Sequence, residues 1–141
     1  MSYRIAETAD GIAVLALDEL CFPQDIRVSL DAARWWLVRR GSEIVGYAGL
    51  RPCQLPHNRG VGFLCRVGIT PEHRGHGLQK RLIRVRERAA RELGLVELVT
   101  YTAPWNLASA NSLIACGYRL YRPEQKWGGA ESMHWRKALR P

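Results

Sequence analysis

The sequence predicts an α/β (α+β) fold in which a mixed β-sheet carries helices on its faces. An apolar run at residues 61–69 is followed by a glycine-containing turn, an amphipathic stretch at 78–93 and a second apolar run at 96–103. Strand, helix and strand in this order form a parallel unit with a right-handed crossover. Residues 35–40 and 43–51 predict an antiparallel hairpin instead, so the sheet should contain both kinds of pairing.

The size and composition fit one folded domain covering residues 1–141. Apolar residues make up 47% and charged residues 24% of the chain, which is ordinary for a globular protein and unlike a disordered one. No internal repeat or low-complexity tract divides the chain. The first twenty residues contain four acidic side chains and show no signal peptide, and no apolar run could cross a membrane. We therefore expect a cytoplasmic protein.

The N-terminal third predicts a short strand at residues 3–7 and then two helical pieces. Asp10 is placed to cap the first helix. A second helical piece is expected to begin near Ser29 or Asp31. The apolar side chains at helical spacing in the first helix are Ile12, Leu15, Ala16 and Leu20.

The central third predicts a long strand and a long helix. In a strand, alternate residues share a face, so residues 61–69 should place one set of side chains together: Phe63, Cys65, Val67 and Ile69. The helix should be ended by Gly94 and should bury one stripe. That stripe comprises Leu78, Leu82, Val85, Ala89 and Leu93.

The C-terminal third predicts a capped helix and two strands. Asn106 is a favourable N-cap, and the helix should run to Cys116 and stop at Gly117. Residues 118–122 and 132–139 are expected to be strands. The Pro- and Gly-rich stretches 51–60 and 122–131 are expected to be loops.

The net charge and the cysteines limit the kinds of partner and metal site that the sequence predicts. Twenty-one Lys and Arg against thirteen Asp and Glu give a net charge of +8, which favours anionic partners or a solvated basic surface. The four cysteines, Cys21, Cys53, Cys65 and Cys116, form no CxxC pair, so reduced thiols are expected. A zinc site from Cys53, His57, His73 and His76 matches no standard ligand spacing, and we expect no metal.

The stretch "ITPEHRGHGLQKRL" (69–82) joins the central strand to the long helix. Ligand sites in parallel units lie past the carboxyl end of the strand, where the free amides of the next helix point outward. Gly75 and Gly77 allow the backbone to approach an oxyanion closely, and Arg74 and Lys80 add positive charge. No GxxxxGK[ST] motif is present, and the stretch is a poor Rossmann fingerprint. Taken alone, it could equally be an ordinary basic turn.

With this stretch the sequence resembles the Gcn5-related N-acetyltransferase family, whose acetyl-CoA loop follows the pattern Arg/Gln-x-x-Gly-x-Gly/Ala. The match is Arg74 to Gln79, preceded by the family-like "VGITPEH". Asn106, Gly117 and Tyr118 also hold the family spacing. The resemblance implies a mostly antiparallel central sheet with one parallel β-α-β unit and helices on both faces. It further implies acetyl transfer from acetyl-CoA to a primary amine, carried by a small molecule or a protein, and it leaves a homodimer open.

The resemblance also assigns roles to individual residues. The backbone of the central strand would pair with the pantetheine arm, the amides of the loop would hold the pyrophosphate, and an asparagine would touch the cofactor. In chain order these residues are Val67, Gly68, Ile69, Arg74, Gly75, His76, Gly77, Leu78, Gln79, Lys80 and Asn106.

Two departures from the family pattern concern the reaction. Gln79 replaces a small residue and would either crowd the pyrophosphate or give it an amide donor. Leu113 stands where many members have the tyrosine that protonates the leaving CoA thiolate. The candidate substitutes for this acid are Tyr118, Ser109, Tyr121 and Cys116, and the candidate bases are Tyr101, Asp25, His57, Glu124 and His134. Trp105 and Trp127 are candidates to line the acceptor site.

Two other classes of function remain open from the sequence. The missing tyrosine also fits a non-catalytic CoA-binding module. A basic nucleic-acid-binding domain is suggested by arginines spaced along one helix face, although Glu87 and Glu92 can pair with them. These arginines are Arg81, Arg84, Arg88 and Arg91.

Overall fold

The computed structural model describes residues 2–52, 60–124 and 131–140, and it contains one seven-stranded sheet. The strand order is β1-β2-β3-β4-β5-β7-β6, with β4 and β5 parallel and the other neighbours antiparallel. The strands are β1 (Arg4–Thr8), β2 (Arg34–Arg40), β3 (Glu43–Pro52), β4 (Val61–Ile69), β5 (Glu97–Thr102), β6 (Arg119–Tyr121) and β7 (Met133–Ala138). The helices are α1 (Gly11–Cys21), α2 (Leu78–Glu92) and α3 (Leu107–Ala115), with a short 3-10 turn at Pro71–His73.

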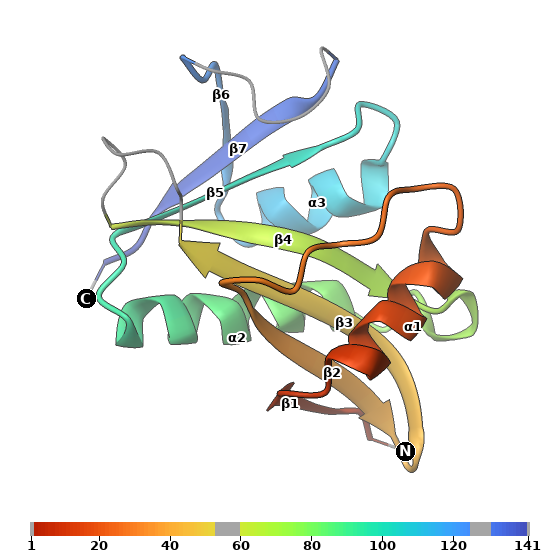
Figure 1. Ribbon diagram of the computed structural model, residues 1–141. Helices are drawn as coiled ribbons and strands as arrows, with labels where there is room; N and C mark the ends of the chain where they lie inside the picture. The colour runs from red at the N-terminus through yellow and green to blue at the C-terminus, as the bar shows by residue number, and fades with distance from the viewer. Residues whose placement is uncertain (1, 53–59, 125–130, 141) are drawn as a thin grey trace.

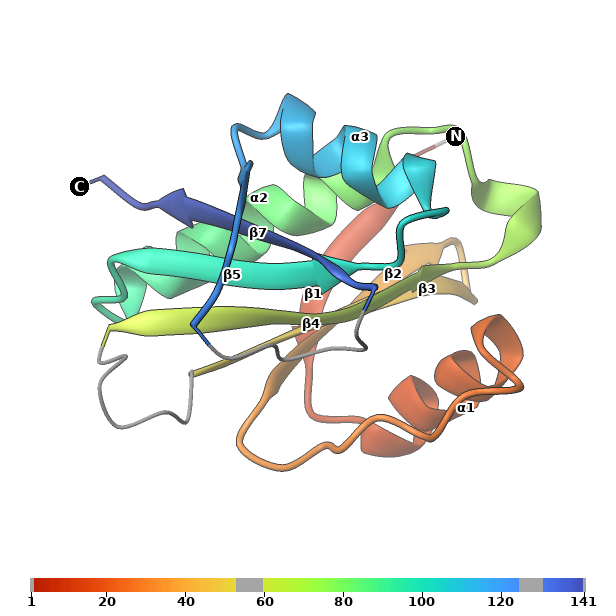
Figure 2. The same ribbon diagram turned by 90° about the horizontal axis from the view of Figure 1, so that it is seen from above.

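The helices form layers on both faces of the sheet, as predicted. Figure 1 shows α2 and α3 side by side on one face, and Figure 2 shows α1 on the opposite face. Each layer buries its own apolar cluster against the sheet. The larger cluster includes Leu82, Ile83 and Leu113 beneath α2 and α3, and the smaller one includes Val14 and Leu17 beneath α1.

The hairpin of β2 and β3 confirms the turn expected between them. Arg40 pairs with Glu43 across a two-residue loop, and Gly41 adopts a φ of 60°. A positive φ is accessible to glycine at little steric cost, which explains its place in this turn.

Helix α1 begins where predicted but turns a different face to the core. Asp10 caps it by accepting a hydrogen bond from the Ala13 amide at 3.1 Å. Ile12 and Leu20 are 84% and 62% exposed, so the stripe predicted from them is wrong. The buried residues are Val14, Leu17 and Asp18. Apolar residues occur all round this helix, so their spacing could not indicate which face is buried. The buried face is the one that carries Asp18, whose hydrogen-bond partners lie on the sheet and in the segment after the helix.

No helix forms near Ser29 or Asp31, contrary to the sequence prediction. Residues 22–33 run irregularly between α1 and β2. Asp18 binds this segment directly, because its Oδ2 accepts a hydrogen bond from the Val28 amide at 3.1 Å. The Arg27 side chain donates to the carbonyl oxygens of Phe22 and Asp25. These three backbone groups are thus bound by side chains and not by helical hydrogen bonds.

A β-bulge in β4 overturns the prediction that its alternate residues share one face. Ala48 pairs with Val67 and Leu50 with Leu64, so two residues of β4 lie opposite Gly49 alone. The extra residue reverses the alternation. As a result Phe63 packs in the α1 cluster, whereas Val67 packs against the cluster beneath α2 and α3. Cys65 packs in the same cluster as Phe63, and Ile69 packs against the same cluster as Val67.

The ends of α2 and α3 follow the predicted signals. Gly94, with a φ of 79°, follows the end of α2, and Gly117, with a φ of 91°, follows the end of α3. Asn106 caps α3 by accepting a hydrogen bond from the Ser109 amide at 3.2 Å. These caps fix where each helix starts and stops relative to β4 and β5.

Candidate active site

The parallel strands β4 and β5 are paired along only part of their length. Their register runs from Val61 opposite Glu97 to Phe63 opposite Val99. The next contact is a side-chain hydrogen bond, from Thr100 Oγ1 to the Leu64 carbonyl at 2.9 Å. Past this point the two strands diverge towards their carboxyl ends (Figure 1). The β5-facing edge of β4 is therefore unpaired with any described strand in the part that contains Val67, Gly68 and Ile69.

Two neighbouring cavities fill the opening. One, of about 500 Å³, lies at the loop before α2 and is called the loop cavity here. The other, of about 300 Å³, lies deeper between the strands and is called the deep cavity. The lining residues that the two share are Phe22, Val67, Gln79, Asn106 and Ser109. The pair of cavities thus extends from the loop to the middle of the sheet.

The loop cavity gathers most of the residues predicted to bind the cofactor. The predicted residues that line it are Val67, Gly68, Ile69, Arg74, Gly75, Gly77, Leu78, Gln79, Lys80 and Asn106. The ring of the remaining one, His76, is directed to Tyr3, with ring centroids 5.6 Å apart, and does not line the cavity. Sequence reasoning therefore brought together a set of residues that lie together in space.

The backbone of this loop is suited to an anion. The first amide with a helical partner is that of Arg81, which donates to the Gly77 carbonyl, so the amides of Leu78, Gln79 and Lys80 precede the hydrogen-bonded turns. Such amides, together with the helix dipole, attract negative charge. Gly75 and Gly77 have φ values of 83° and 74°, which other residues rarely adopt.

The side chains of the loop are partly committed to internal contacts. Arg74 donates from Nε to the Ile69 carbonyl at 3.0 Å, which anchors the loop to the end of β4. Gln79 donates from Nε2 to Ser109 Oγ at 2.8 Å and so connects the first turn of α2 to α3. The side chain of Gln79 is therefore turned towards α3.

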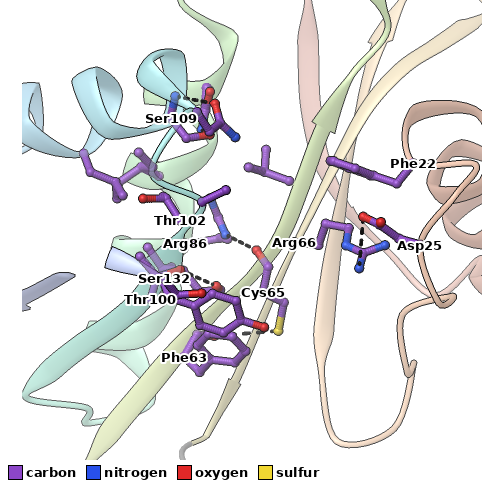
Figure 3. A pocket seen from close by; sticks show the side chains of 18 residues that line it. Phe22, Asp25, Phe63, Cys65, Arg66, Arg86, Thr100, Thr102, Ser109 and Ser132 are labelled. Atoms are coloured by element: carbon purple, nitrogen blue, oxygen red, sulfur yellow. Dashed lines mark hydrogen bonds and ion pairs between the residues drawn. The ribbon is translucent and has the colours of Figure 1, made fainter. Parts of the chain in front are cut away.

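The deep cavity opens through the sheet, so it has two unlike sides (Figure 3). Ile83, Arg86 and Leu113 belong to α2 and α3 on one side, and Asp25 and Arg66 lie on the α1 side. The residues of the strand edges that line it include Leu64, Cys65, Thr100, Tyr101 and Thr102. Two reactants could thus meet in it from opposite faces of the sheet.

A buried carboxylate, Asp18, organises the α1 side. Asp18 has no exposed area and accepts hydrogen bonds from Tyr47 Oη at 2.5 Å and Arg66 Nη1 at 3.1 Å. Arg27 Nη1 lies 3.2 Å from its other oxygen. Burial is the main cause that raises the pKa of Tyr47 well above its usual value, and the hydrogen bond to Asp18 raises it further. The Tyr47 hydroxyl therefore stays protonated and remains a donor. Arg66 is thereby held over the ring of Phe22, at 4.9 Å.

The proposed catalytic side chains are placed very differently. Ser109 lines both cavities and Tyr101 lines the deep one, with its ring stacked at 5.7 Å on that of Phe63. Tyr118 lines neither cavity. It is 3% exposed, and its hydroxyl donates to Glu87 at 2.8 Å, while burial raises its pKa well above the usual value. This placement gives Tyr118 no contact with a substrate in either cavity.

The other candidates from the sequence are also dispersed. Asp25 lines the deep cavity, 3.8 Å from Arg66. His134 is buried with its ring 6.0 Å from that of Tyr101, and Trp105 is 77% exposed. Cys116 is buried at the end of α3, where burial raises its pKa. Cys53, His57 and Trp127 lie outside the described residues.

Sequence reasoning missed three buried charged residues, Asp18, Arg86 and Glu87; it paired Glu87 with the arginines of α2, whereas Glu87 is 4% exposed and binds Tyr118 and Lys137. Asp18 follows Val14 by four residues, and Arg86 lies midway between Leu82 and Ala90, at four residues from each. A charged residue in register with buried apolar ones is a signal that could have been read. Leu113, in contrast, lines the deep cavity and is 4% exposed, so the family's tyrosine position faces this space.

The comparisons with known proteins agree with this architecture. The sequence model of the Acetyltransferase (GNAT) family matches residues 7–118. The chain belongs to this acetyltransferase family. Among curated relatives, N-acetyltransferase 8B of Rattus norvegicus is 26% identical over 97 residues, which cover 66% of this chain and 44% of that protein. The chain spans less than half the length of the curated relatives it matches.

Solved structures share the GNAT fold along almost the whole chain. A putative acyl-CoA N-acyltransferase from Klebsiella pneumoniae subsp. pneumoniae has a TM-score of 0.74 at 23% identity, covering 98% of each chain. A putative acetyltransferase from Salmonella typhimurium, solved with its cofactor acetyl-CoA, has a TM-score of 0.77 at 18% identity, covering 99% of this chain and 95% of that one. Within the described residues of this GNAT protein, no helix is long and apolar enough to cross a membrane. No metal-binding group of three or more side chains was found among those residues.

Proposed function

We propose that this protein transfers an acetyl group from acetyl-CoA to a primary amine by direct attack of the amine on the thioester. The observation that carries the proposal is the divergence of β4 from β5, which leaves a strand edge unpaired and ends at a loop of free amides. An extended pantetheine arm would complete the sheet at this edge, and its pyrophosphate would meet the helix N-terminus.

The two-sided deep cavity supports a division of the reaction between the two faces of the sheet. The thioester would enter beside Ile83 and Leu113, and the amine would enter past Asp25 and Tyr101. Holding the two reactants in one orientation supplies much of the rate of such a reaction. A backbone amide of β4 near Val67 would polarise the carbonyl.

The amine must lose a proton before or during transfer. Asp25 and Tyr101 are the titratable side chains that we propose for this role, directly or through water, because both line the acceptor side of the deep cavity. Ser109 lines both cavities and is a candidate to protonate the leaving sulfur, directly or through a bound water.

A second candidate function is CoA binding without catalysis. It is favoured by Leu113, which presents no hydroxyl to the deep cavity, and by the position of Tyr118 outside both cavities. A thiol is nevertheless a good leaving group, with a pKa of roughly 8.5 by analogy with cysteine, so an acid is not essential.

The experiment combines a panel of amines with detection of the free thiol released from acetyl-CoA. The panel should include small polyamines, amino acids, aromatic amines and peptides with free N-termini. We expect CoA release above the uncatalysed rate with at least one class. Calorimetric binding of CoA without turnover of any amine would favour the non-catalytic alternative, and absence of CoA binding would refute both.

We also propose that the protein acts in the cytoplasm. The cysteines Cys21, Cys65 and Cys116 are free thiols, which suits a reducing compartment. Localisation of a tagged full-length chain by fractionation would test this, and recovery in an oxidising compartment would contradict it.

A further inference from the structure

Arg86 is a buried cation with no carboxylate partner among the described residues. It belongs to α2, is 1% exposed and donates from Nε to the Leu82 carbonyl at 3.0 Å. Its Nη1 donates to the carbonyls of Gly49 at 3.0 Å and Cys65 at 3.2 Å. These carbonyls belong to the bulge, since Cys65 is one of the two β4 residues that lie opposite Gly49. Neutral carbonyl groups compensate the burial of a guanidinium only in part, because they bring no opposite charge.

The charge of Arg86 persists at neutral pH. Burial lowers the pKa of Arg86 to about 10, which still leaves the guanidinium protonated at pH 7. The neighbouring acid, Glu87, is committed elsewhere, since it binds Tyr118 Oη at 2.8 Å and Lys137 Nζ at 3.0 Å. A fixed positive charge therefore lies beneath the bulge.

Arg86 reaches the deep cavity from the side of α2 and α3. Figure 3 shows it near Thr102 and the Cys65 carbonyl, across the cavity from Asp25 and Arg66. No described residue is hydrogen-bonded to its Nη2. Arg66, the other arginine that lines the cavity, is already paired with Asp18. Arg86 is thus the cation better placed to meet an anion that arises in this space.

The same side of the cavity offers few groups acidic enough to protonate a thiolate. Thr100 uses its hydroxyl hydrogen to bind the Leu64 carbonyl. Thr102 Oγ1 accepts from Trp135 Nε1 at 3.0 Å and keeps its own hydrogen, but an aliphatic alcohol is a much weaker acid than a thiol. Leu113 is apolar. Along α2, the residues that line the two cavities are Leu78, Gln79, Lys80, Ile83 and Arg86 in succession. Arg86 lies on the order of 12 Å from Leu78 along the helix. A cofactor anchored at the loop and extended along α2 would bring its reacting end to Arg86.

We propose that Arg86 stabilises the CoA thiolate as it leaves, in place of the proton that a tyrosine would donate. The inference rests on the proposed acetyl transfer. The nitrogen lone pair of the amine forms the C–N bond at the thioester carbonyl carbon. The ammonium proton passes to Asp25 or Tyr101, directly or through water, and from there to the solvent. The carbonyl reforms as the C–S bond breaks, and the bonding pair leaves on sulfur. The products are the N-acetylated amine, CoA thiolate and one proton.

The test is the pKa of the thiol of CoA while it is bound, measured from thiolate ultraviolet absorbance across a pH series. We expect the thiol bound to the unmodified protein to titrate at least about one pH unit below free CoA, as thiols beside arginine do. Calorimetry should then show CoA affinity rising about tenfold for each pH unit between the bound and the free pKa of the thiol. An analogue with hydrogen in place of the thiol should show no such rise.

Variants assign the effect to the side chain. Arg86→Met should return the bound thiol to the pKa of free CoA, and Arg86→Lys should lower the thiol pKa part of the way again. The control Arg88→Met, on the exposed face of the same helix, should leave the pKa of the bound thiol as it is in the unmodified protein. Analogue affinity should remain within about threefold in the Arg86 variants, whereas a general loss of structure would lower it as well.

Each remaining outcome is decisive. If circular dichroism shows that Arg86→Met does not fold, the inference is tested by titrating the bound thiol in the unmodified protein and in Arg86→Lys. A bound thiol that has the pKa of free CoA in the unmodified protein overturns the inference. An equally lowered thiol pKa in Arg86→Met and the unmodified protein also overturns it. A preference of more than about tenfold for succinyl-CoA over acetyl-CoA, lost in Arg86→Met, would assign Arg86 to an acyl carboxylate instead. Failure to bind CoA at all would refute the proposed function and with it the role of Arg86, whereas an unshifted pKa of the bound thiol would refute the role of Arg86 alone.

Discussion

Single hydrogen bonds decide how several side chains of this protein can act. Tyr118 is the clearest case, because the sequence made it a candidate substitute for the acid missing at Leu113, while its hydroxyl is bound to Glu87. Lys137 Nζ completes the group by binding Glu87 and the Cys116 carbonyl, at 3.0 and 2.7 Å. The geometry favours a structural role for this group, in which α2, β7 and the end of α3 are held together.

Tyr118→Phe should therefore lower stability without lowering turnover. Removal of the hydroxyl leaves a buried carboxylate with one partner fewer, at a cost of about 1–3 kcal/mol. Chemical denaturation would give the loss, and initial rates of CoA release should stay within about threefold of the unmodified protein. A fall in kcat of a hundredfold with a normal KM would restore Tyr118 as a catalytic acid.

Gln79 should matter little for cofactor affinity, because its amide is engaged with Ser109 at 2.8 Å. Gln79→Ala should change the Kd of CoA by less than about threefold and cost about 1 kcal/mol or less of stability. Calorimetry measures the first and thermal denaturation the second. A tenfold weaker Kd would show that the amide binds the pyrophosphate, and a tenfold stronger one would show that it crowds the loop.

At the scale of the element, turns and caps could be predicted from the sequence, and so could most of the buried stripe of α2, whereas the burial faces of α1 and β4 could not. Gly41, Gly94, Asn106 and Gly117 act within a few residues of themselves, and each marks the boundary expected of it. The bulge of β4 has no such local signal, since it arises from the register with β3. The grouping of the loop residues around one cavity was predictable because these residues are contiguous in the sequence. The deep cavity is lined by residues from α2, α3, β4, β5 and the segment after α1, so it could not be predicted from any one stretch of the sequence.

Gly77 tests the loop as an element. It has a φ of 74°, so an added Cβ would strain its own backbone, but it would meet no other described atom within 4 Å. Any steric effect beyond that strain must therefore come from a ligand. Gly77→Ala should cost about 1 kcal/mol of stability and weaken CoA binding at least about tenfold. Gly41→Ala is the matched control, since Gly41 has a φ of 60° and equally open surroundings in the β2–β3 turn. It should lose similar stability and keep CoA affinity; equal affinity loss in both would point to general destabilisation.

The segment between α1 and β2 should depend on Asp18. Asp18→Ala would leave Arg27 and Arg66 without their shared buried carboxylate and Tyr47 without an acceptor. We expect a loss of about 3 kcal/mol in the free energy of unfolding, measured by denaturant titration. Glu19→Gln, at the exposed neighbouring position, should change it by less than about 0.5 kcal/mol. Comparable losses in both variants would show that Asp18 has no special role.

At the scale of the whole molecule, one incompletely paired sheet explains the arrangement of the site. The parallel pair β4 and β5 joins two antiparallel parts of the sheet, and their divergence creates the opening between two helical layers (Figures 1 and 2). The fold class and the parallel unit were predictable because helix and strand periodicities are read over long segments. The opening depends on how far two strands stay paired, and no property of either strand alone determines that.

Hydrogen–deuterium exchange of the backbone amides, with and without saturating acetyl-CoA, tests this account most directly. We expect new protection at the amides of residues 67–69 and 75–80, because the first segment would pair with the pantetheine arm and the second would hold the pyrophosphate. The exposed β2–β3 turn should be unchanged. Binding of acetyl-CoA without protection at either segment, or with protection only outside the opening between β4 and β5, would contradict it.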